Sequence, residues 1–184
     1  MGRYIALLRG INVGGKNKVD MRDLTVLFEK NGFTEVSTYI NSGNVLFSSR
    51  KTDGEGLVKE CEALLAAEYP FKIAVAVISA EELRAALENA PVWWNSDPES
   101  KHNAIFVIPP ATVEKIMEQV GAAKPEYEKV DYQGRVIFWS APIKTFSKTR
   151  WSKIVGSSAY DRVTIRNANT ALKLLELTKP ESAK

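Results

Sequence analysis

The order of strand-like and helix-like segments limits the possible folds of this chain more than any other feature. Residues 3–79 predict strand, helix, strand, strand, helix, strand, and residues 101–166 predict the same order again. In each half, two β-rich runs flank a tight turn, at Ser42-Gly43 and at Gln133-Gly134. This order is that of the split βαβ, or ferredoxin-like, unit. We therefore predict an α+β fold of two tandem ferredoxin-like (βαββαβ) units.

Helix-capping residues, glycines and prolines predict where the elements begin and end. Asp20 can cap a helix that ends at Gly32, and Pro70 stops a second helix after the stretch "GLVKECEALLAAEY". The polar stretch "NSDPESK" is typical of a boundary between domains. We predict a first unit over residues 1–79, a linking helix and linker over 80–100, and a second unit with a C-terminal helix over 101–184.

Composition places the chain among ordinary globular proteins. Apolar residues make up 45% of it and charged residues 26%, and no apolar run approaches the roughly 20 residues that span a bilayer. The start, "MGRYIA", lacks the pattern of a signal peptide. A single cysteine, Cys61, excludes an internal disulfide and suits a reducing compartment. We expect a cytoplasmic protein with no membrane partner.

The stretch "LLRGINVGGKNKV" nearly matches the phosphate-binding P-loop. In a P-loop, Ser or Thr follows the lysine and a helix begins at that point, whereas here Asn17 follows Lys16 and the predicted helix begins only after Asp20. A nucleotide-hydrolysing P-loop is therefore excluded. Two interpretations stay open: an anion-binding loop of glycine, asparagine and lysine, or a surface turn that needs Gly14 and Gly15 for its backbone.

Charge is unevenly distributed along the chain. Residues 135–166 contain seven Lys or Arg and one acidic residue, Asp161, although the whole chain has a net charge of only +3. Such a segment can attract an anionic ligand, or it can be a solvated basic face balanced by acidic residues elsewhere. The sequence alone does not choose between the two.

Two stretches taken together, "LLRGINVGGKNKV" and "TYINSGNVLF", resemble a bacterial family catalogued as domain of unknown function 1697. The later stretches "SKTRWSKIVG" and "TIRNANTALKLLEL" are similar to that family too, although Ala168 stands where the family commonly has a tryptophan. The resemblance implies a two-part α+β fold and no particular activity. It also points to Gly10, Gly43, Ser147 and Thr170 as motif residues.

Residues 1–50 are basic as well, with seven Lys or Arg against four acidic residues. Because these two basic regions coincide with the motif stretches, we predict that the two regions bound one cleft. Their shared amide, hydroxyl and cationic side chains are those that bind a phosphorylated group. The predicted ligand-binding residues are Arg9, Asn12, Gly14, Gly15, Lys16, Asn17, Asn41, Ser42, Asn44, Lys148, Arg166 and Asn167.

Side chains that commonly carry catalysis or hold metals are scarce. His102 is the only histidine and is predicted to be a surface residue at the start of a strand, while Cys61 lies on an apolar helical stripe and is predicted to be core. The carboxylates of residues 126–131 are predicted to be solvated. We predict no metal and no cofactor.

Three functions remain open at this stage. The first is the binding of an anionic, phosphorylated ligand, with single-stranded nucleic acid as one form of it. The second is a protein-interaction or oligomer-forming domain, and the third is an enzyme for a small phosphorylated substrate, for which no acid or base is identified. Neither catalysis nor the oligomeric state is predicted.

Overall fold

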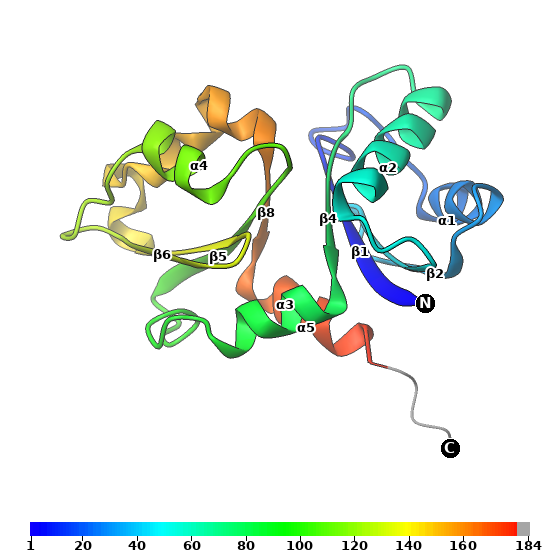
Figure 1. The fold of residues 1–184 in the computed structure, drawn as a ribbon. Helices are drawn as coiled ribbons and strands as arrows, with labels where there is room; N and C mark the ends of the chain where they lie inside the picture. Colours follow the sequence, from blue (N-terminus) through cyan, green and yellow to red (C-terminus); the bar gives the residue numbers. More distant parts are fainter. Residues whose placement is uncertain (180–184) are drawn as a thin grey trace. The chain divides into compact units, whose positions relative to one another are not determined.

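The computed structural model of the protein describes residues 1–179 and contains two four-stranded antiparallel sheets with helices beside them (Figure 1). The predicted α+β class is therefore confirmed. The chain forms two compact units. Unit 1 contains Met1–Glu81 and, from the end of the chain, the described residues from Leu174 on. Unit 2 contains Glu82–Lys173.

The sheet of unit 1 has the strand order β2-β3-β1-β4. Its central strand β1 is buried from Tyr4 to Leu8 and pairs with β3 on one side and β4 on the other, so that Ala6 lies opposite both Val45 and Val77. Every residue of β3 is buried as well. The four strands are β1 (Gly2–Arg9), β2 (Thr34–Tyr39), β3 (Asn44–Ser49) and β4 (Ala74–Ser79).

Two capped helices complete unit 1: α1 (Met21–Lys30), which packs against β2, and α2 (Gly54–Glu68), which packs against β4 (Figure 1). Asp20 caps α1 as predicted, because its carboxylate accepts the backbone N–H groups of Arg22 and Asp23. Asp53 caps α2 in the same way. Acidic side chains thus occupy both helix N-termini of this unit.

The core of unit 1 includes a group of aromatic rings. Phe47 lies at the centre of this group, with ring centroids 4.6 Å from Phe33, 5.6 Å from Phe28 and 5.8 Å from Tyr4. Cys61 on α2 is fully buried, as predicted, and burial raises the pKa of its thiol. The unit is therefore held mainly by apolar side chains that its sheet and helices contribute together.

The sheet of unit 2 repeats the order of the first, as β6-β7-β5-β8. Helix α4 begins after Thr112, whose hydroxyl accepts the backbone N–H of Lys115. The division between the units falls inside α3 and inside α5. The elements are α3 (Ala80–Glu88), β5 (Ser100–Val107), α4 (Val113–Val120), β6 (Lys129–Gln133), β7 (Val136–Pro142), β8 (Val163–Asn167) and α5 (Ala168–Leu177).

Between β7 and β8 the structure differs from the single short helix that "KTRWSKIVG" predicts. Three short 3-10 helices stand there: η1 (Ile143–Lys148), η2 (Trp151–Gly156) and η3 (Ser158–Arg162). Hydroxyl groups at the two breaks explain the difference. Thr149 donates to the carbonyl of Phe146 at 2.7 Å, and Ser157 donates to that of Ile154 at 2.8 Å. Such local bonds compete with a continuing helix.

Candidate functional site

The Gly-rich loop of unit 1 forms a small hairpin between β1 and α1. Asn12 donates its backbone N–H to the carbonyl of Asn17 at 3.0 Å, and Lys16 donates to Val13 at 3.0 Å. Between them Gly14 and Gly15 have φ values of 58° and 74°. Two successive left-handed residues define a type I′ turn, which explains the glycine pair by backbone geometry.

Two of the predicted ligand-binding asparagines hold this hairpin in place. The side-chain amide of Asn12 donates to the carbonyls of Val19 at 3.0 Å and Asn41 at 2.9 Å, and its oxygen accepts the N–H of Val19 at 2.9 Å. The side chain of Asn17 donates to the carbonyl of Gly10 at 2.8 Å. The structure therefore uses both amides to order the loop.

The stretch "TYINSGNVLF" lies beside this loop and is joined to it. Asn44 is fully buried, and its amide donates to the carbonyl of Tyr39 at 2.8 Å and to the hydroxyl of Ser42 at 3.2 Å. The carbonyl of Gly43 accepts the backbone N–H of Leu8 at 2.8 Å. Asn41 and Ser42 are exposed. The two motif stretches of unit 1 thus form one surface, here called the loop surface, made of residues 9–20 and 40–44.

Part of the loop surface remains available to a ligand. The backbone N–H groups of Gly14, Gly15 and Lys18 have no acceptor within the described chain, and the side chains of Lys16 and Lys18 are exposed. A hollow of about 460 Å³ lies beside them. Its lining includes Asn12, Gly15, Lys18, Asp20 and Asn41.

Asp20 gives this hollow an acidic edge. Its carboxylate lies 2.7 Å from the N–H of Arg22 and 3.3 Å from that of Asp23, so the first amides of α1 are already satisfied. A phosphate at the helix terminus would compete with that carboxylate. The start of α1 therefore does not offer free amides to a phosphate, which agrees with the exclusion of a P-loop.

The other three predicted residues belong to unit 2, while nine belong to unit 1. Lys148 ends η1, with its ammonium 5.6 Å from the ring centroid of Tyr127. Arg166 on β8 is buried, and burial lowers its pKa to about 10 although Tyr160 raises it. Asn167 caps α5 by accepting the N–H of Thr170 at 2.8 Å. In this unit as well, predicted site residues have structural partners.

Glu128 is a buried acidic residue that the sequence analysis placed among solvated carboxylates, and that expectation was wrong for it. It is 3% exposed and accepts four N–H groups. One oxygen accepts the backbone N–H groups of Lys124 at 3.0 Å and Arg150 at 2.8 Å, and the other accepts Trp151 N–H and Trp139 Nε1, both at 3.1 Å. No pattern in "PEYEK" indicates that its second glutamate is buried.

His102 was also expected at the surface, but it is 8% exposed. Its Nδ1 accepts the backbone N–H of Asn95 at 3.0 Å and lies 2.6 Å from the hydroxyl of Ser140, and its Nε2 lies 2.7 Å from the carbonyl of Asp97. Because the N–H of Asn95 points at Nδ1, the ring proton is on Nε2, and Nδ1 also accepts the hydroxyl of Ser140. Through these bonds His102 holds the 95–97 loop.

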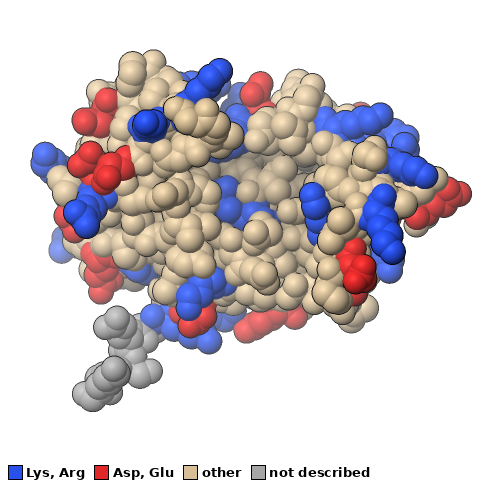
Figure 2. All heavy atoms as spheres, turned by 180° about the vertical axis from the view of Figure 1, so that it is seen from behind, with Lys and Arg blue, Asp and Glu red and all other residues tan. Residues whose placement is uncertain are grey.

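The tryptophans of the basic segment belong to the core of unit 2. Trp151 is fully buried and donates from Nε1 to the carbonyl of Gly121 at 3.2 Å. Trp139 is 3% exposed and lies 5.1 Å from Phe146, centroid to centroid. Neither ring is available to stack on a base. Figure 2 shows both signs of charge on each half of the face it presents.

Within residues 1–179, no group of three or more His, Cys, Asp or Glu is arranged to hold a metal ion. No helix in the same range is long and apolar enough to cross a membrane. Burial lowers the pKa of Arg3 and Arg166 and raises the pKa of Cys61 and Tyr69, and none of these four residues lines the hollow beside the hairpin.

Comparison with known proteins places the chain in a family. The family described as a protein of unknown function, DUF1697, matches residues 1–138. A solved structure of a conserved bacterial protein from Streptococcus pneumoniae is 35% identical, covers 97% of this chain and 99% of its own, and has a TM-score of 0.86. A comparison with curated proteins gives no match.

A second solved structure, of the first two RRM domains of a yeast poly(U)-binding protein, is 9% identical over 90% of this chain and 98% of its own. Its TM-score of 0.26 is too low to support an argument about fold or function. The match over residues 1–138 and the 35% identity over nearly the whole chain agree with each other. The chain therefore belongs to the DUF1697 family of proteins of unknown function.

Proposed function

We propose that the protein binds a small ligand that carries a phosphoryl-type anionic group, and that the hairpin of the loop surface contacts this group. The observation that carries the proposal is the set of three backbone N–H groups without an acceptor, at Gly14, Gly15 and Lys18. Backbone N–H groups exposed at a tight turn bind anions without needing a helix terminus. The exposed ammonium groups of Lys16 and Lys18 supply the charge.

The remaining predicted residues support this function indirectly. Asn12 and Asn17 order the hairpin, so that its N–H groups are arranged before a ligand arrives, which lowers the entropy lost on binding. Asn41 and Ser42 are exposed, and Asn41 also lines the hollow beside the hairpin. These two residues suit contacts with the uncharged part of the ligand.

The chemistry of the loop surface favours binding over turnover. Asp20, the acidic residue that lines the hollow, already accepts two backbone N–H groups at the start of α1. A group in that role is a poor general acid or base, since proton transfer would break the helix cap. We therefore put ligand binding before catalysis.

A small ligand also fits better than single-stranded nucleic acid. Tyr4 and Phe47, the aromatic residues of the central strands of unit 1, pack in its core, as Trp139 does in unit 2. Recognition of single strands relies on exposed aromatic rings beside a basic groove.

We also infer a ferredoxin-like fold for each unit, because the strand order of each sheet is the order of a ferredoxin-like unit.

Binding of inorganic phosphate, nucleoside monophosphates, sugar phosphates and short oligonucleotides, measured by isothermal titration calorimetry, tests the proposal. We expect a phosphorylated compound to bind, and Lys16→Ala and Lys18→Ala each to weaken binding about tenfold, as the loss of one charge-assisted contact does. Lys59→Ala removes an exposed lysine from α2 and serves as the control. Equal weakening by all three variants, or no binding of any phosphorylated compound, would contradict the proposal.

A further inference from the structure

The 95–97 loop is exposed, and one buried side chain of unit 2 holds it at both ends. Asn95 donates its backbone N–H to Nδ1 of His102 at 3.0 Å, and Nε2 of the same ring donates to the carbonyl of Asp97 at 2.7 Å. The side chain of His102 is 6% exposed, whereas that of Asp97 is 46% exposed. The position of the loop therefore depends on the hydrogen bonds of one titratable ring.

Other contacts fix the chain only on either side of the loop. Before it, the buried ring of Trp94 donates from Nε1 to the carbonyl of Asn103 at 2.9 Å. After it, the carbonyl of Glu99 accepts the N–H of Ile143 at 2.9 Å. Among the described residues, the loop makes one further hydrogen bond, from the hydroxyl of Ser96 to a carbonyl three residues earlier. That bond is local and does not connect the loop to the sheet.

The neutral ring of His102 suits all of its partners, but a protonated ring cannot keep the same bonds. Both nitrogens of a charged imidazole are donors, so Nδ1–H would face the N–H of Asn95. The hydroxyl of Ser140, 2.6 Å from Nδ1, can turn and accept the new proton, because a hydroxyl both donates and accepts. The backbone N–H of Asn95 has no such freedom, so its bond to the ring is lost.

Asp97 responds to the same proton in the opposite direction. Its carbonyl would accept from a charged donor, and a charge-assisted hydrogen bond is stronger than a neutral one. Its carboxylate lies 3.8 Å from Nε2 of His102 and attracts a charged ring. Protonation therefore removes one attachment of the loop and strengthens the other.

Other charged groups stand near the ring. Lys129 on β6 pairs with Ser140, the residue opposite His102, and Arg166 on β8 pairs with Ala104, two positions further along β5. Paired residues share a face of a sheet, as alternate residues of a strand do, so both cations lie on the face of the ring and oppose its protonation. With the residues that line the adjoining hollows, the charged groups around His102 are Asp97, Lys101, Glu126, Glu128, Lys129 and Arg166.

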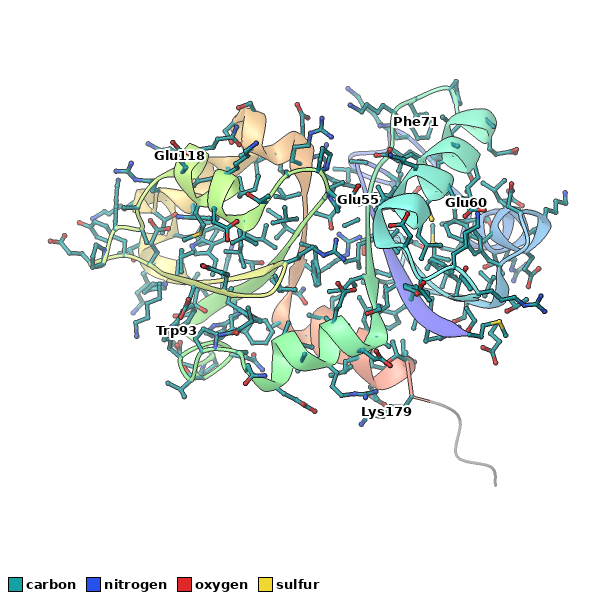
Figure 3. The ribbon with its side chains drawn as sticks, in the orientation of Figure 1. Glu55, Glu60, Phe71, Trp93, Glu118 and Lys179 are labelled. Atoms are coloured by element: carbon teal, nitrogen blue, oxygen red, sulfur yellow. The ribbon has the colours of Figure 1, made fainter. Side chains whose placement is uncertain are left out.

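The loop lines two hollows, so its movement would change the surface of unit 2. Ser96 and Asp97 line a hollow of about 650 Å³ at the end of β8 and a second of about 260 Å³. The second hollow is also lined by Ser140 and by Trp93, which is half-buried in the segment that follows α3 (Figure 3). A shift of the loop thus alters both hollows together.

We propose that His102 is a pH-dependent switch for the 95–97 loop: the neutral ring holds the loop at Asn95, and the protonated ring releases it there while it keeps Asp97. The left-handed backbone of Asn95, with φ of 58°, is uncommon for a residue other than glycine and can relax on release. The change falls between about pH 5 and 8, where histidine side chains titrate. This switch lies in unit 2 and does not depend on the anion site proposed in unit 1.

An NMR titration of the full chain from about pH 8 to about pH 5 tests the proposal. His102 is the only histidine, so every imidazole resonance belongs to it. We expect the amide signal of Asn95 to shift with the same midpoint as the ring, and its protection against exchange with water to fall about tenfold, as the loss of one hydrogen bond does. The amides of β5 should keep their protection.

Three outcomes of this titration would overturn the proposal. The first is a ring that gains its proton while the amide of Asn95 stays unchanged. The second is a ring that remains neutral at the lower end of the titration. The third is a loss of protection throughout β5 at the same midpoint, which would show unfolding of the unit instead of movement of the loop.

Variants assign the switch to named groups. His102→Gln removes the titrating ring and should make the amide of Asn95 insensitive to pH. Asp97→Asn keeps the carbonyl and removes the carboxylate, so the midpoint of the ring should fall by about half a pH unit at low salt. Glu118→Gln, at an exposed carboxylate on α4 that Figure 3 shows away from Trp93, should leave the midpoint unchanged. A pH response of Asn95 that persists in His102→Gln, or equal midpoints in Asp97→Asn and Glu118→Gln, would contradict the assignment.

Discussion

Units 1 and 2 have the same strand order but are stabilised in different ways between their third and fourth strands. In unit 1 that connection is α2, 15 residues long, with a buried stripe that includes Leu57, Cys61 and Leu65. In unit 2 it is three short 3-10 helices, and the buried carboxylate of Glu128 accepts the backbone N–H groups of Arg150 and Trp151 where η2 begins. The same strand order therefore occurs with an apolar helix in one unit and with short 3-10 helices bonded to a buried carboxylate in the other.

This difference has a physical cause that can be followed residue by residue. A long helix satisfies its own backbone, so α2 needs only an apolar face to be held. Short 3-10 segments leave N–H groups without partners, and that of Trp151, a buried residue, would be unsatisfied if Glu128 did not accept it. We expect unit 1 to respond most to lost volume and unit 2 to lost hydrogen bonds.

The largest effect is expected from Phe47→Ala in unit 1. The ring is fully buried among Tyr4, Phe28 and Phe33, and its removal leaves a cavity that the sheet cannot close. We expect the free energy of unfolding to fall by about 4 kcal/mol in urea denaturation followed by circular dichroism. Phe47→Leu keeps most of the volume and should cost less than half as much; equal losses would contradict the volume argument.

The next effect is expected from Glu128→Gln in unit 2, which keeps shape and volume. One oxygen becomes an NH₂ group that faces donors, so two N–H groups lose their acceptor. We expect a loss of about 3 kcal/mol in the same measurement. Glu126→Gln, at an exposed carboxylate two residues earlier, should change stability by less than about 0.5 kcal/mol. A similar small change for both variants would show that the hydrogen bonds of Glu128 contribute little to the free energy of unfolding.

The β2–β3 hairpin of unit 1 and the β6–β7 hairpin of unit 2 each contain a glycine with positive φ, Gly43 and Gly134. A Cβ at Gly43 would lie 2.8 Å from Leu8 Cβ, and φ is +87°, whereas a Cβ at Gly134 meets nothing within 4 Å at a φ of +56°. Gly134→Ala should therefore cost only the left-handed backbone, about 1 kcal/mol, and Gly43→Ala at least twice that. Thermal unfolding of both variants checks this, and a larger loss in Gly134→Ala would reverse the comparison.

The smallest stability effect, with a clear effect on binding, is expected from Asp20→Asn. Asparagine caps α1 as well as aspartate does, so the free energy of unfolding should change by only a few tenths of a kcal/mol. Removal of the negative charge at the hollow should raise the affinity for inorganic phosphate about threefold to fivefold at low salt. Calorimetric titration in low and high salt measures this, and an unchanged affinity would count against the anion site in unit 1.

Local signals predicted the regular elements of the fold. The apolar spacing of α1 together with Asp20 and Gly32 marks both of its ends, and the Gln133-Gly134 pair marks the second hairpin. These patterns reflect forces that act within a few residues of the chain. They fail between β7 and β8, where one helix was expected over residues 148–156 and three short 3-10 helices stand over residues 143–162, with Thr149 and Ser157 at the breaks between them.

The structural roles of single polar residues could not be predicted in this way. Glu128 is buried because its acceptors serve Arg150 and Trp151, 22 and 23 positions later, and His102 because Ser140 lies opposite it on β7. Among the candidate residues, the amides of Asn12, Asn17 and Asn44 turned out to bond the backbone. A sequence shows which side chains can form hydrogen bonds, but only the fold shows which of them already have partners.

All four tryptophans of the chain, Trp93, Trp94, Trp139 and Trp151, lie in unit 2, and the single cysteine, Cys61, is buried in unit 1. The wild-type chain therefore contains one natural probe of unfolding for each unit. Tryptophan fluorescence follows the unfolding of unit 2, while the rate at which a thiol reagent labels Cys61 follows the opening of unit 1. Recorded together during denaturation, the two signals reveal whether the units unfold in one cooperative step or in sequence.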